Sequence, residues 1–333
     1  KDLSIVYTPL HGTGMTLIPR SLALWGFENV HCVEAQMVKD GNFPTVVSPN
    51  PENAEALTLA LKLAKEIDAD IVMASDPDAD RVGMACKNDK GEWVLVDGNQ
   101  TCMIFLYYII MNRKAQGKMQ GNEFIVKTIV TTELIRAIAE KNHIKMYDCY
   151  TGFKWIARQI RLDEGKMQYI GGGEESYGFL AEDFVRDKDA VNATLLVCEA
   201  AAWYAQQGMT LLDAIEALYK EFGYYRNALC SFAFEGETGM YTMQNLMKTL
   251  RADPPKEIAG YAVERVADYD TDGTGLPRAN VLEYHLAGGH KLMVRPSGTE
   301  PKIKTYFTTL GKDLAEAEAQ EKVLADALKP ILA

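Results

Sequence analysis

Three aspartates alternate with other residues in one short stretch of the chain. They are Asp76, Asp78 and Asp80, and Arg81 follows them directly. The apolar run 71–74 precedes them, so we expect a buried strand that opens into a loop at the carboxyl edge of a sheet, where open α/β folds bind ligands. Carboxylates this close repel one another, and a divalent cation would hold them together. An all-oxygen ligand set without His or Cys suits Mg²⁺ or Mn²⁺ better than Zn²⁺.

Two simpler interpretations of acidic stretches compete with a metal loop of this kind. One is a solvated acidic turn. The other is an EF-hand calcium loop, which needs Gly at its sixth position and Glu at its twelfth. Arg81 and Lys87 stand at those positions here, and a later acidic run that starts at Asp268 has Gly273 but then Ala279. Neither stretch is therefore an EF-hand.

A run of glycines, 171–173, follows an apolar segment and leads into Glu174 and Ser176. Glycines let the backbone approach a ligand closely. The glutamate then offers a hydrogen-bond acceptor and the serine a hydroxyl, which suits the recognition of neighbouring sugar hydroxyls. A plain glycine turn is the alternative.

A second polar loop lies between the last two expected strands and contains Arg295, Ser297, Gly298 and Thr299. It combines a guanidinium group, two hydroxyls and a flexible glycine. These are the donors that a phosphate dianion needs, and arginine can bind such a group through two hydrogen bonds. A polar hairpin tip is the alternative, because turns are usually polar.

The elements that position these loops follow from the hydrophobic periodicity. Up to residue 222, short apolar runs alternate with helical patterns, and beyond it strands follow one another. We expect strands at 3–7, 30–33, 71–74, 124–127, 145–150 and 167–170, a hairpin around Asn88–Gly91, and helices at 132–141, 190–206 and 211–222. Asn50 and Pro51 predict the start of a further helix that reaches Ile67. After residue 223 we expect strands at 229–234, 261–267, 281–286, 290–294 and 303–308, with helices at 240–250 and from 313.

The fold class is therefore α/β. Two mixed-sheet α/β domains precede a small α+β domain with an antiparallel sheet. Apolar periodicity lapses near 113–122, and Gly223 with its two following tyrosines marks a second boundary. We expect domains at 1–118, 119–223 and 224–333.

Composition limits the classes of function. The chain has 333 residues, of which 47% are apolar and 24% charged, and its formal charge of −11 argues against nucleic-acid binding. No apolar run is long enough to predict a membrane span, and no signal peptide is visible at the start. Six separated cysteines indicate reduced, buried side chains. We expect a cytoplasmic protein.

The motifs resemble those of the α-D-phosphohexomutases, the phosphoglucomutase/phosphomannomutase family, and do so in the family's order. The acidic stretch resembles the metal loop, and Gly173–Ser176 resembles the sugar-recognition loop. The loop at 295–301 resembles the one that holds the non-reacting phosphate. Weaker matches are Thr151-Gly152-Phe153-Lys154 and the opening segment 8–14, which resembles the start of the family's second domain. The resemblance covers nearly the whole chain.

The resemblance implies a role for each matching residue. Asp76, Asp78 and Asp80 would hold one Mg²⁺, together with a phosphoserine oxygen, and Arg81 would sit beside that phosphoserine. Lys188, in an Arg-Asp-Lys-Asp run, would act at the reacting phosphate, where proton transfer would require a lowered pKa. His11 is a second catalytic candidate, although a structural role is the more common one for such a histidine. The predicted substrate-binding residues are Thr151, Gly152, Lys154, Glu174, Ser176, Arg295, Ser297, Gly298 and Thr299.

The implied activity is phosphoryl transfer that converts glucose 1-phosphate to glucose 6-phosphate through a phosphoserine, with glucose 1,6-bisphosphate as intermediate and activator. The partner is thus a small sugar phosphate, with no nucleic acid and no membrane. The Glu-Glu-Ser-Tyr-Gly run at 174–178 favours the phosphoglucomutase and phosphopentomutase branches, while phosphopentomutase and phosphomannomutase activities stay open. We expect the predicted loops to converge on a single cavity.

The chain departs from the family pattern in one respect. The family's first domain carries a Ser-His-Asn-Pro-like loop whose serine is the phosphoryl carrier, and this sequence has no Ser-His dipeptide. We expect a fragment of domains two to four that lacks the N-terminal phosphoserine domain and is inactive alone; a natural serine-free mutase is a weaker alternative. A non-catalytic sugar-phosphate binding protein is a rival from another class. A haloacid-dehalogenase-like phosphatase would need an Asp-x-Asp-x-Thr pattern after its first strand, and the acidic stretch at 76–80 lacks it.

Overall fold

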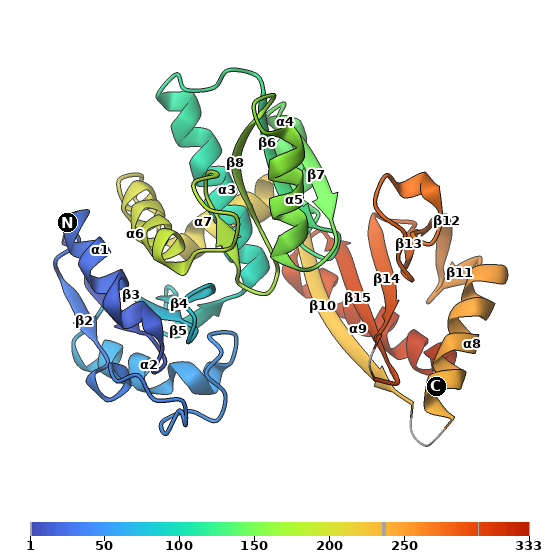
Figure 1. Ribbon diagram of the computed structural model, residues 1–333, viewed down its shortest axis with the longest axis horizontal. Coiled ribbons are helices and arrows are strands. Elements are labelled where there is room, and N and C mark those ends of the chain that lie inside the picture. Colours follow the sequence, from blue (N-terminus) through green and yellow to red (C-terminus); the bar gives the residue numbers. More distant parts are fainter. Residues whose placement is uncertain (1, 235–237, 299, 333) are drawn as a thin grey trace. The chain divides into compact units, whose positions relative to one another are not determined.

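The computed structural model describes residues 2–234, 238–298 and 300–332 (Figure 1). These residues form three sheets in two compact units. The first unit contains the residues up to 131 together with 135–218, and the second contains 132–134 together with the chain from 219 onward. Two sheets belong to the first unit and one to the second. The fold is thus the predicted one, with two mixed-sheet α/β parts followed by an antiparallel sheet.

The first sheet has the strand order β2-β1-β3-β4-β5. Its strands are β1 (Ile5–Thr8), β2 (Val30–Cys32), β3 (Ile71–Ser75), β4 (Val82–Lys87) and β5 (Trp93–Val96). β1 runs parallel to β2 and β3, whereas β4 and β5 form the predicted hairpin. Thr8 pairs with Ala74, so the loops that leave β1 and β3 start at the same edge. The acidic loop is one of these two loops.

Helices cover both faces of this sheet. α2 (Thr58–Glu66) packs with its Ala60 and Ala64 on one face, against a cluster that includes Val6 and Val72. α1 (Ile18–Leu24) and α6 (Ala190–Ala205) contact each other, and α6 reaches the opposite face, where Cys198 Sγ lies 3.9 Å from Met73 Sδ. Alternation along β3 explains the division, because Val72 and Met73 point to opposite faces.

The expected helix start at Asn50 is wrong. Residues 51–53 form a turn, a short 3₁₀ helix covers Ala54–Leu57, and α2 begins only at Thr58. Asn50 accepts the N–H of Glu52 instead of capping a helix. Its side chain therefore stabilises a local turn, which is the competing use of asparagine next to proline.

The second sheet has the order β7-β6-β8-β9, with β6 (Glu123–Thr128) between β7 (Lys145–Cys149) and β8 (Gln168–Gly173), and β9 (Phe179–Leu180) at the edge. On one face, α5 (Phe153–Asp163) packs through Phe153 and Ile156 against Phe124 and Val126 of β6. On the other face, α3 (Gly98–Ala115) places Phe105 edge-on to Phe179, with ring centroids 5.0 Å apart. Figure 1 shows α3 and α5 on either side of β8.

β8 continues through the glycine run, whereas the prediction ended the strand at residue 170. Gly171 explains the difference, because a Cβ there would lie 2.9 Å from Leu106 of α3. The strand can pass under the helix only without side chains at this point. This unit also contains the greater part of α4 (Leu134–Lys141) and of α7 (Leu211–Phe222).

The second unit is built on an antiparallel sheet of order β10-β15-β14-β13-β12-β11. Its strands are β10 (Tyr224–Ala233), β11 (Glu257–Ile258), β12 (Tyr261–Asp268), β13 (Leu282–Leu286), β14 (His290–Pro296) and β15 (Lys302–Gly311). α8 (Gly239–Ala252) and α9 (Leu314–Leu332) pack on one face, where Met247 and Leu324 share a core with Leu292 and Phe307. None of the helices in the described ranges combines the length and apolarity that a bilayer crossing needs.

Candidate functional site

The acidic loop is organised around Asp76, which is fully buried. Its Oδ1 accepts the backbone N–H groups of Asp80 and Arg81, at 3.0 and 2.9 Å. Its Oδ2 accepts from Arg81 Nε at 2.7 Å. Ala79 has a φ of 59°, which lets the chain double back so that these N–H groups face the carboxylate. These three hydrogen bonds to the buried Asp76 carboxylate fix the conformation of the loop.

Asp78 is exposed and Asp80 partly buried, and each offers an oxygen to the same small volume as Asp76. The three ligand atoms all lie within 4.8 Å of one another. Within the described part of the chain this is the one group of three or more acidic, His or Cys side chains whose ligand atoms lie that close together. A set made only of carboxylate oxygens is the chemistry that Mg²⁺ prefers, so the residues fit the predicted ion.

Arg81 connects the acidic loop to two other segments. Its guanidinium lies 3.1 Å from Glu52, in the turn before α2. Its backbone forms an isolated antiparallel bridge with Gly178, and the next residue, Val82, donates its N–H to Tyr177 at 3.2 Å. The acidic loop is therefore hydrogen-bonded, within the first unit, to the residues that directly follow Ser176.

Lys188 also reaches the acidic loop, and its Nζ lies 2.7 Å from Asp80 Oδ2. The contact is close-packed, because a Cβ at Gly178 would lie 2.4 Å from the lysine Cδ. Burial disfavours the charged form of Lys188, but the hydrogen bond and charge of Asp80, with Asp187 and Glu174, raise the pKa overall. The raised pKa favours the ammonium form of Lys188 beside Asp80, and a role of this lysine in proton transfer stays a prediction.

Glu174 lies at the end of β8, is only 4% exposed, and accepts the backbone N–H of Gly152 at 2.7 Å. Burial raises the pKa of its carboxyl group, and the Gly152 bond opposes that rise only in part. Gly152 has a φ of 107°, a backbone conformation that glycine adopts more readily than other residues, and it precedes the first turn of α5. One hydrogen bond thus joins the Thr151–Lys154 motif to the Gly173–Ser176 motif. Ser176 follows, partly buried.

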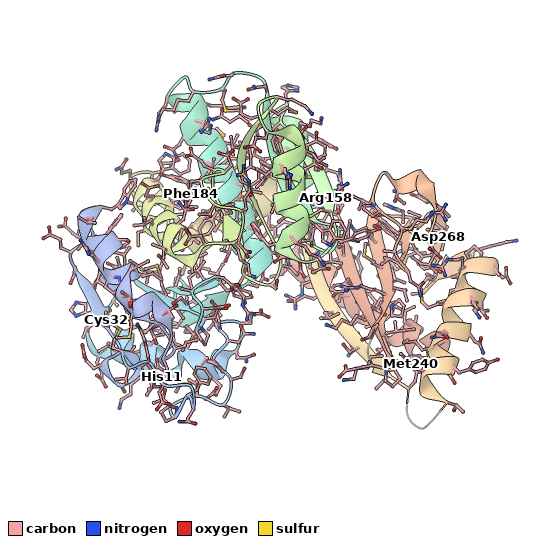
Figure 2. All side chains as sticks on the ribbon, in the orientation of Figure 1. His11, Cys32, Arg158, Phe184, Met240 and Asp268 are labelled. Carbon is pink, nitrogen blue, oxygen red and sulfur yellow. The ribbon has the colours of Figure 1, made fainter. Side chains whose placement is uncertain are left out.

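The other predicted residues of this unit lie in different surroundings. Both ring nitrogens of His11 have partners, Nδ1 with Val38 O at 3.0 Å and Nε2 with Thr45 Oγ1 at 2.8 Å. This buried histidine, labelled in Figure 2, bridges two loops. Lys154 is exposed on α5, with its Nζ 5.6 Å from the centre of the Trp155 ring, and Thr151 is partly buried.

The arginine loop belongs to the second unit and joins β14 to β15. Arg295 is exposed, and Ser297 accepts the N–H of Glu300 at 3.2 Å. A Cβ at Gly298 would meet nothing within 4 Å, so this glycine lies open. The predicted Thr299 falls outside the described residues. Because the structure describes each unit by itself, convergence of this loop with the acidic loop stays a prediction.

Comparison with known proteins identifies the family of this chain. Residues 1–91 match the model of phosphoglucomutase/phosphomannomutase α/β/α domain II. Residues 97–222 match that of α/β/α domain III, and residues 245–326 match the C-terminal domain. The chain belongs to the phosphoglucomutase/phosphomannomutase family.

Individual members of the family show how much of the fold is shared. The phosphoglucomutase of Staphylococcus haemolyticus is 36% identical over 331 residues, which cover 96% of this chain and 59% of the relative. The open form of Paramecium pp63/parafusin, a phosphoglucomutase, has a TM-score of 0.68 at 19% identity and covers 100% of this chain and 57% of its own. Aspergillus fumigatus N-acetylphosphoglucosamine mutase, solved with GlcNAc-6P and magnesium, has a TM-score of 0.53 at 13% identity, and covers 100% and 62%. The chain thus spans less than two thirds of these relatives.

The family's domain III model begins at residue 97, whereas the predicted first boundary stands at 118. The difference concerns α3, which contacts β8 and α6. The lapse of periodicity near 113–122 marks the end of this helix, a feature that resembles a domain boundary in sequence. The predicted boundaries stay predictions.

Sequence reasoning missed two groups that support the phosphohexomutase loops. Glu52 holds Arg81, but nothing in a turn before a helix distinguishes it from other acids. Gly12 packs against the acidic loop, where a Cβ would lie 2.3 Å from the Cα of Pro77, and Thr13 donates its N–H to Pro77 O at 2.8 Å. The Gly-Thr-Gly spacing of the opening turn was the available signal for this second contact.

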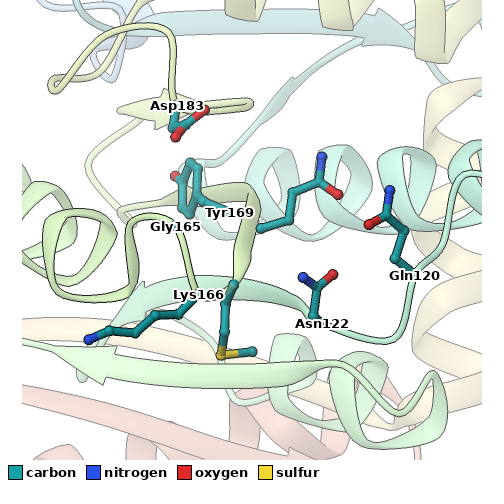
Figure 3. Close-up of a pocket in the computed structure, with 8 residues that line it drawn as sticks. Gln120, Asn122, Gly165, Lys166, Tyr169 and Asp183 are labelled. Atoms are coloured by element: carbon teal, nitrogen blue, oxygen red, sulfur yellow. The ribbon is translucent and has the colours of Figure 1, made fainter.

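A pocket of about 310 Å³ lies at the other end of the second sheet (Figure 3). Asn122 precedes β6 and Gln168 begins β8, whereas the loop that contains Glu174 leaves β8 at its far end. Its lining is polar, with Gln120, Asn122, Gly165, Lys166, Met167, Gln168, Tyr169 and Asp183. None of these eight is a predicted site residue, so the pocket is separate from the phosphohexomutase loops.

Proposed function

We propose that this chain carries the metal-binding and sugar-phosphate-binding parts of a phosphoglucomutase, an enzyme that moves a phosphoryl group between two hydroxyls of glucose. The main support for the proposal is a set of contacts within the first unit. They join the acidic loop to the residues that follow Ser176 and to the segment that contains Lys188. Arg81 bridges to Gly178, and Lys188 pairs with Asp80. The relatives at 36–38% identity are named phosphoglucomutases, which favours glucose phosphates over pentose or mannose phosphates.

The acidic loop would act at the reacting phosphoryl group. Asp76, Asp78 and Asp80 would hold Mg²⁺, which supplies positive charge to the oxygens where negative charge spreads during phosphoryl transfer. Arg81 is anchored by Asp76 and Glu52, so its guanidinium is held ready beside that charge. Lys188 adds an ammonium group that stays protonated at neutral pH.

Binding of the sugar would fall to the loop after β8 and the loop before α5. Glu174 and Ser176 would accept and donate hydrogen bonds to the ring hydroxyls. Gly152 fixes Glu174 by its N–H, and Thr151 and Lys154 border the same loop. His11, with both ring nitrogens occupied, would position the opening loop and not take part in proton transfer.

The far phosphate would be held by the arginine loop through Arg295, Ser297, Gly298 and Thr299. Lys304 would extend this site, because it stands opposite Arg295 in the register of β14 and β15. Like charges opposite each other on one face of a sheet repel, and an anion between them would relieve the repulsion. The sequence motif alone did not include this lysine, which lies two residues inside the next strand.

The phosphoryl carrier lies outside these 333 residues in our proposal. No Ser-His dipeptide occurs in them, so we expect no turnover by the chain alone. Purified chain would be incubated with glucose 1-phosphate, catalytic glucose 1,6-bisphosphate and Mg²⁺, and glucose 6-phosphate measured by a coupled assay. Turnover above background would refute this reading.

Binding tests the function itself. We expect calorimetry to show that glucose 1-phosphate binds more tightly than inorganic phosphate, and that ribose 1-phosphate and mannose 1-phosphate bind more weakly than the glucose compound. Glu174→Gln should reduce this preference and leave the phosphate affinity unchanged. Equal affinity for glucose 1-phosphate and phosphate would contradict a sugar site. Mg²⁺ alone should bind weakly, since the phosphoserine ligand is not in this chain.

A further inference from the structure

Glu175 stands beside the predicted sugar-binding Glu174, but its side chain turns to a different set of partners. Its Oε2 accepts hydrogen bonds from Thr128 Oγ1 at 3.0 Å and Thr131 Oγ1 at 3.1 Å. These two hydroxyls also lie 2.8 Å from each other. The carboxylate is therefore held at the end of β6, the strand beside β8. Burial is the main reason why the pKa of Glu175 is raised, and the two threonine hydroxyls oppose the rise.

Thr128 and Thr131, which bind the Glu175 side chain, lie in a turn that a buried lysine holds in place. Lys127, fully buried, donates to the carbonyls of Thr128 and Thr131, each at 3.2 Å, and pairs with Asp148 at 2.8 Å. A buried ammonium group with three oxygen partners leaves the turn little freedom. The anchor of Glu175 is thus part of the sheet and not a mobile surface group.

The backbone of Glu175 is held as closely as its side chain. A Cβ on Gly98, the first residue of α3, would lie only 2.0 Å from the carbonyl oxygen of Glu175. The helix start therefore touches the loop directly. On the other side of the loop, Glu174 meets the N–H of Gly152 at 2.7 Å. Contacts to the backbone and the side chain of Glu175 therefore hold the loop in place directly next to Glu174.

We propose that Glu175 is a positioning residue, whose bonds to Thr128 and Thr131 set the place of the Glu174 carboxylate for sugar recognition. This inference rests on the proposed function for its consequence in binding, but the position of Glu174 can be measured without any sugar. Glu175 lies in the turn directly after Glu174, so contacts that fix the backbone and side chain of Glu175 also limit where the Glu174 carboxylate can lie. Preorganised groups of this kind bind a ligand without a further ordering cost.

The direct readout is hydrogen exchange at the Gly152 amide, which reports the bond to Glu174. Glu175→Gln replaces the charged acceptor by a weaker neutral one, and Thr131→Val removes one donor; we expect each to accelerate this exchange about tenfold. Thr131→Val keeps the shape of the side chain and therefore serves where the glutamate variant folds poorly. Exchange within β6 and β8 should stay unchanged.

Two variants in α6 provide matched controls. Glu199 has a pKa that burial raises, and it accepts from Tyr108 at 3.2 Å; Thr194 is buried, and its hydroxyl donates to Val191 O. Glu199→Gln and Thr194→Val should leave the Gly152 amide as protected as in the unmodified chain. Faster exchange in the controls as well would mean that the effect is a general loosening, and this would overturn the proposal.

Calorimetry then tests the consequence for recognition. Both test variants should bind glucose 1-phosphate about tenfold more weakly and inorganic phosphate as before, because only the sugar contact is displaced. Unchanged Gly152 exchange with unchanged affinity would overturn the inference. If the unmodified chain does not prefer glucose 1-phosphate over phosphate, the proposed function is contradicted. The hydrogen-exchange experiment would still decide whether Glu175 positions Glu174.

Discussion

Asp76, Asp78 and Asp80 have the same side chain but different surroundings. Asp76 is fully buried and its oxygens receive the N–H groups of its own loop and the Arg81 side chain. Asp78 is exposed. A buried carboxylate that organises N–H groups contributes to stability, whereas an exposed one is free to serve a ligand. The three residues should therefore respond differently to removal.

We expect Asp76→Ala to destabilise the first unit by about 2–3 kcal/mol, because it leaves N–H groups and a guanidinium without their acceptor. Asp78→Ala, the matched control, should change stability by less than about 0.5 kcal/mol, as is usual for exposed positions. Urea unfolding followed by circular dichroism measures both, and Mg²⁺ titration should show weaker binding for both. Equal stability losses would show that Asp76 has no special structural role.

Glu283 offers a prediction about pH. Burial alone would raise its pKa, but His285, Lys291 and the hydroxyl of Tyr269 together lower it from 4.5 to about 2. A carboxyl group with a lowered folded-state pKa stabilises the fold above its unfolded pKa, and that stability is lost as the pH falls from about 4.5 toward 2. The difference between the two values corresponds to about 3 kcal/mol at neutral pH.

Glu283→Gln is the test of this pH dependence. The variant should be less stable than the unmodified chain at pH 7, and its stability should change less between pH 5 and pH 2. Urea unfolding over that range, followed by circular dichroism, gives both curves. Parallel curves would mean that Glu283 does not carry the dependence.

At the scale of secondary-structure elements, a close contact with the start of α3 fixes the position of the loop that follows β8. α3 begins with a capping box, in which Asp97 and Gln100 exchange hydrogen bonds between side chain and backbone. Gly98 then lies against the carbonyl of Glu175. The start of α3 and the loop that contains Glu175 are thus in close contact, and only a residue without a side chain permits this approach.

Gly98→Ala tests this contact. Alanine normally favours a helix over glycine by about 1 kcal/mol, but here its Cβ would overlap backbone atoms. We expect a loss of about 1–3 kcal/mol in stability, as for other overpacked sites, together with weaker glucose 1-phosphate binding. Gly41→Ala, whose Cβ would meet nothing within 4 Å, is the control and should change neither. Thermal denaturation and calorimetry measure the two effects, and a stabilised Gly98→Ala would contradict the contact.

At the scale of the whole molecule, α6 makes one unit of the two α/β sheets. It belongs to the domain III model by sequence, yet it packs on the first sheet through Cys198 and Met73 as well as on α3. The second unit has its own core between its antiparallel sheet and two helices, where Met247 is 1% exposed. The described chain therefore has separate cores in its two units.

Two core substitutions test this division. Met73→Ala and Met247→Ala each remove a buried side chain, which typically lowers stability by about 2–5 kcal/mol. Hydrogen exchange should accelerate mainly in β1 and β3 for the first variant and mainly in β13 and β14 for the second. Equal acceleration in both regions by either variant would show that the two cores unfold as one.

Local chemistry in the sequence was sufficient to predict the acidic loop, the β4–β5 hairpin and α7, whose bounds, Leu211–Phe222, agree with the prediction. Each depends on residues that are neighbours along the chain. Only the tertiary structure decided that Arg81 pairs with Glu52 and that Glu175 turns toward Thr128. These outcomes depend on contacts between segments tens of residues apart, and such contacts are selected by how helices and sheets pack, which local periodicity does not encode.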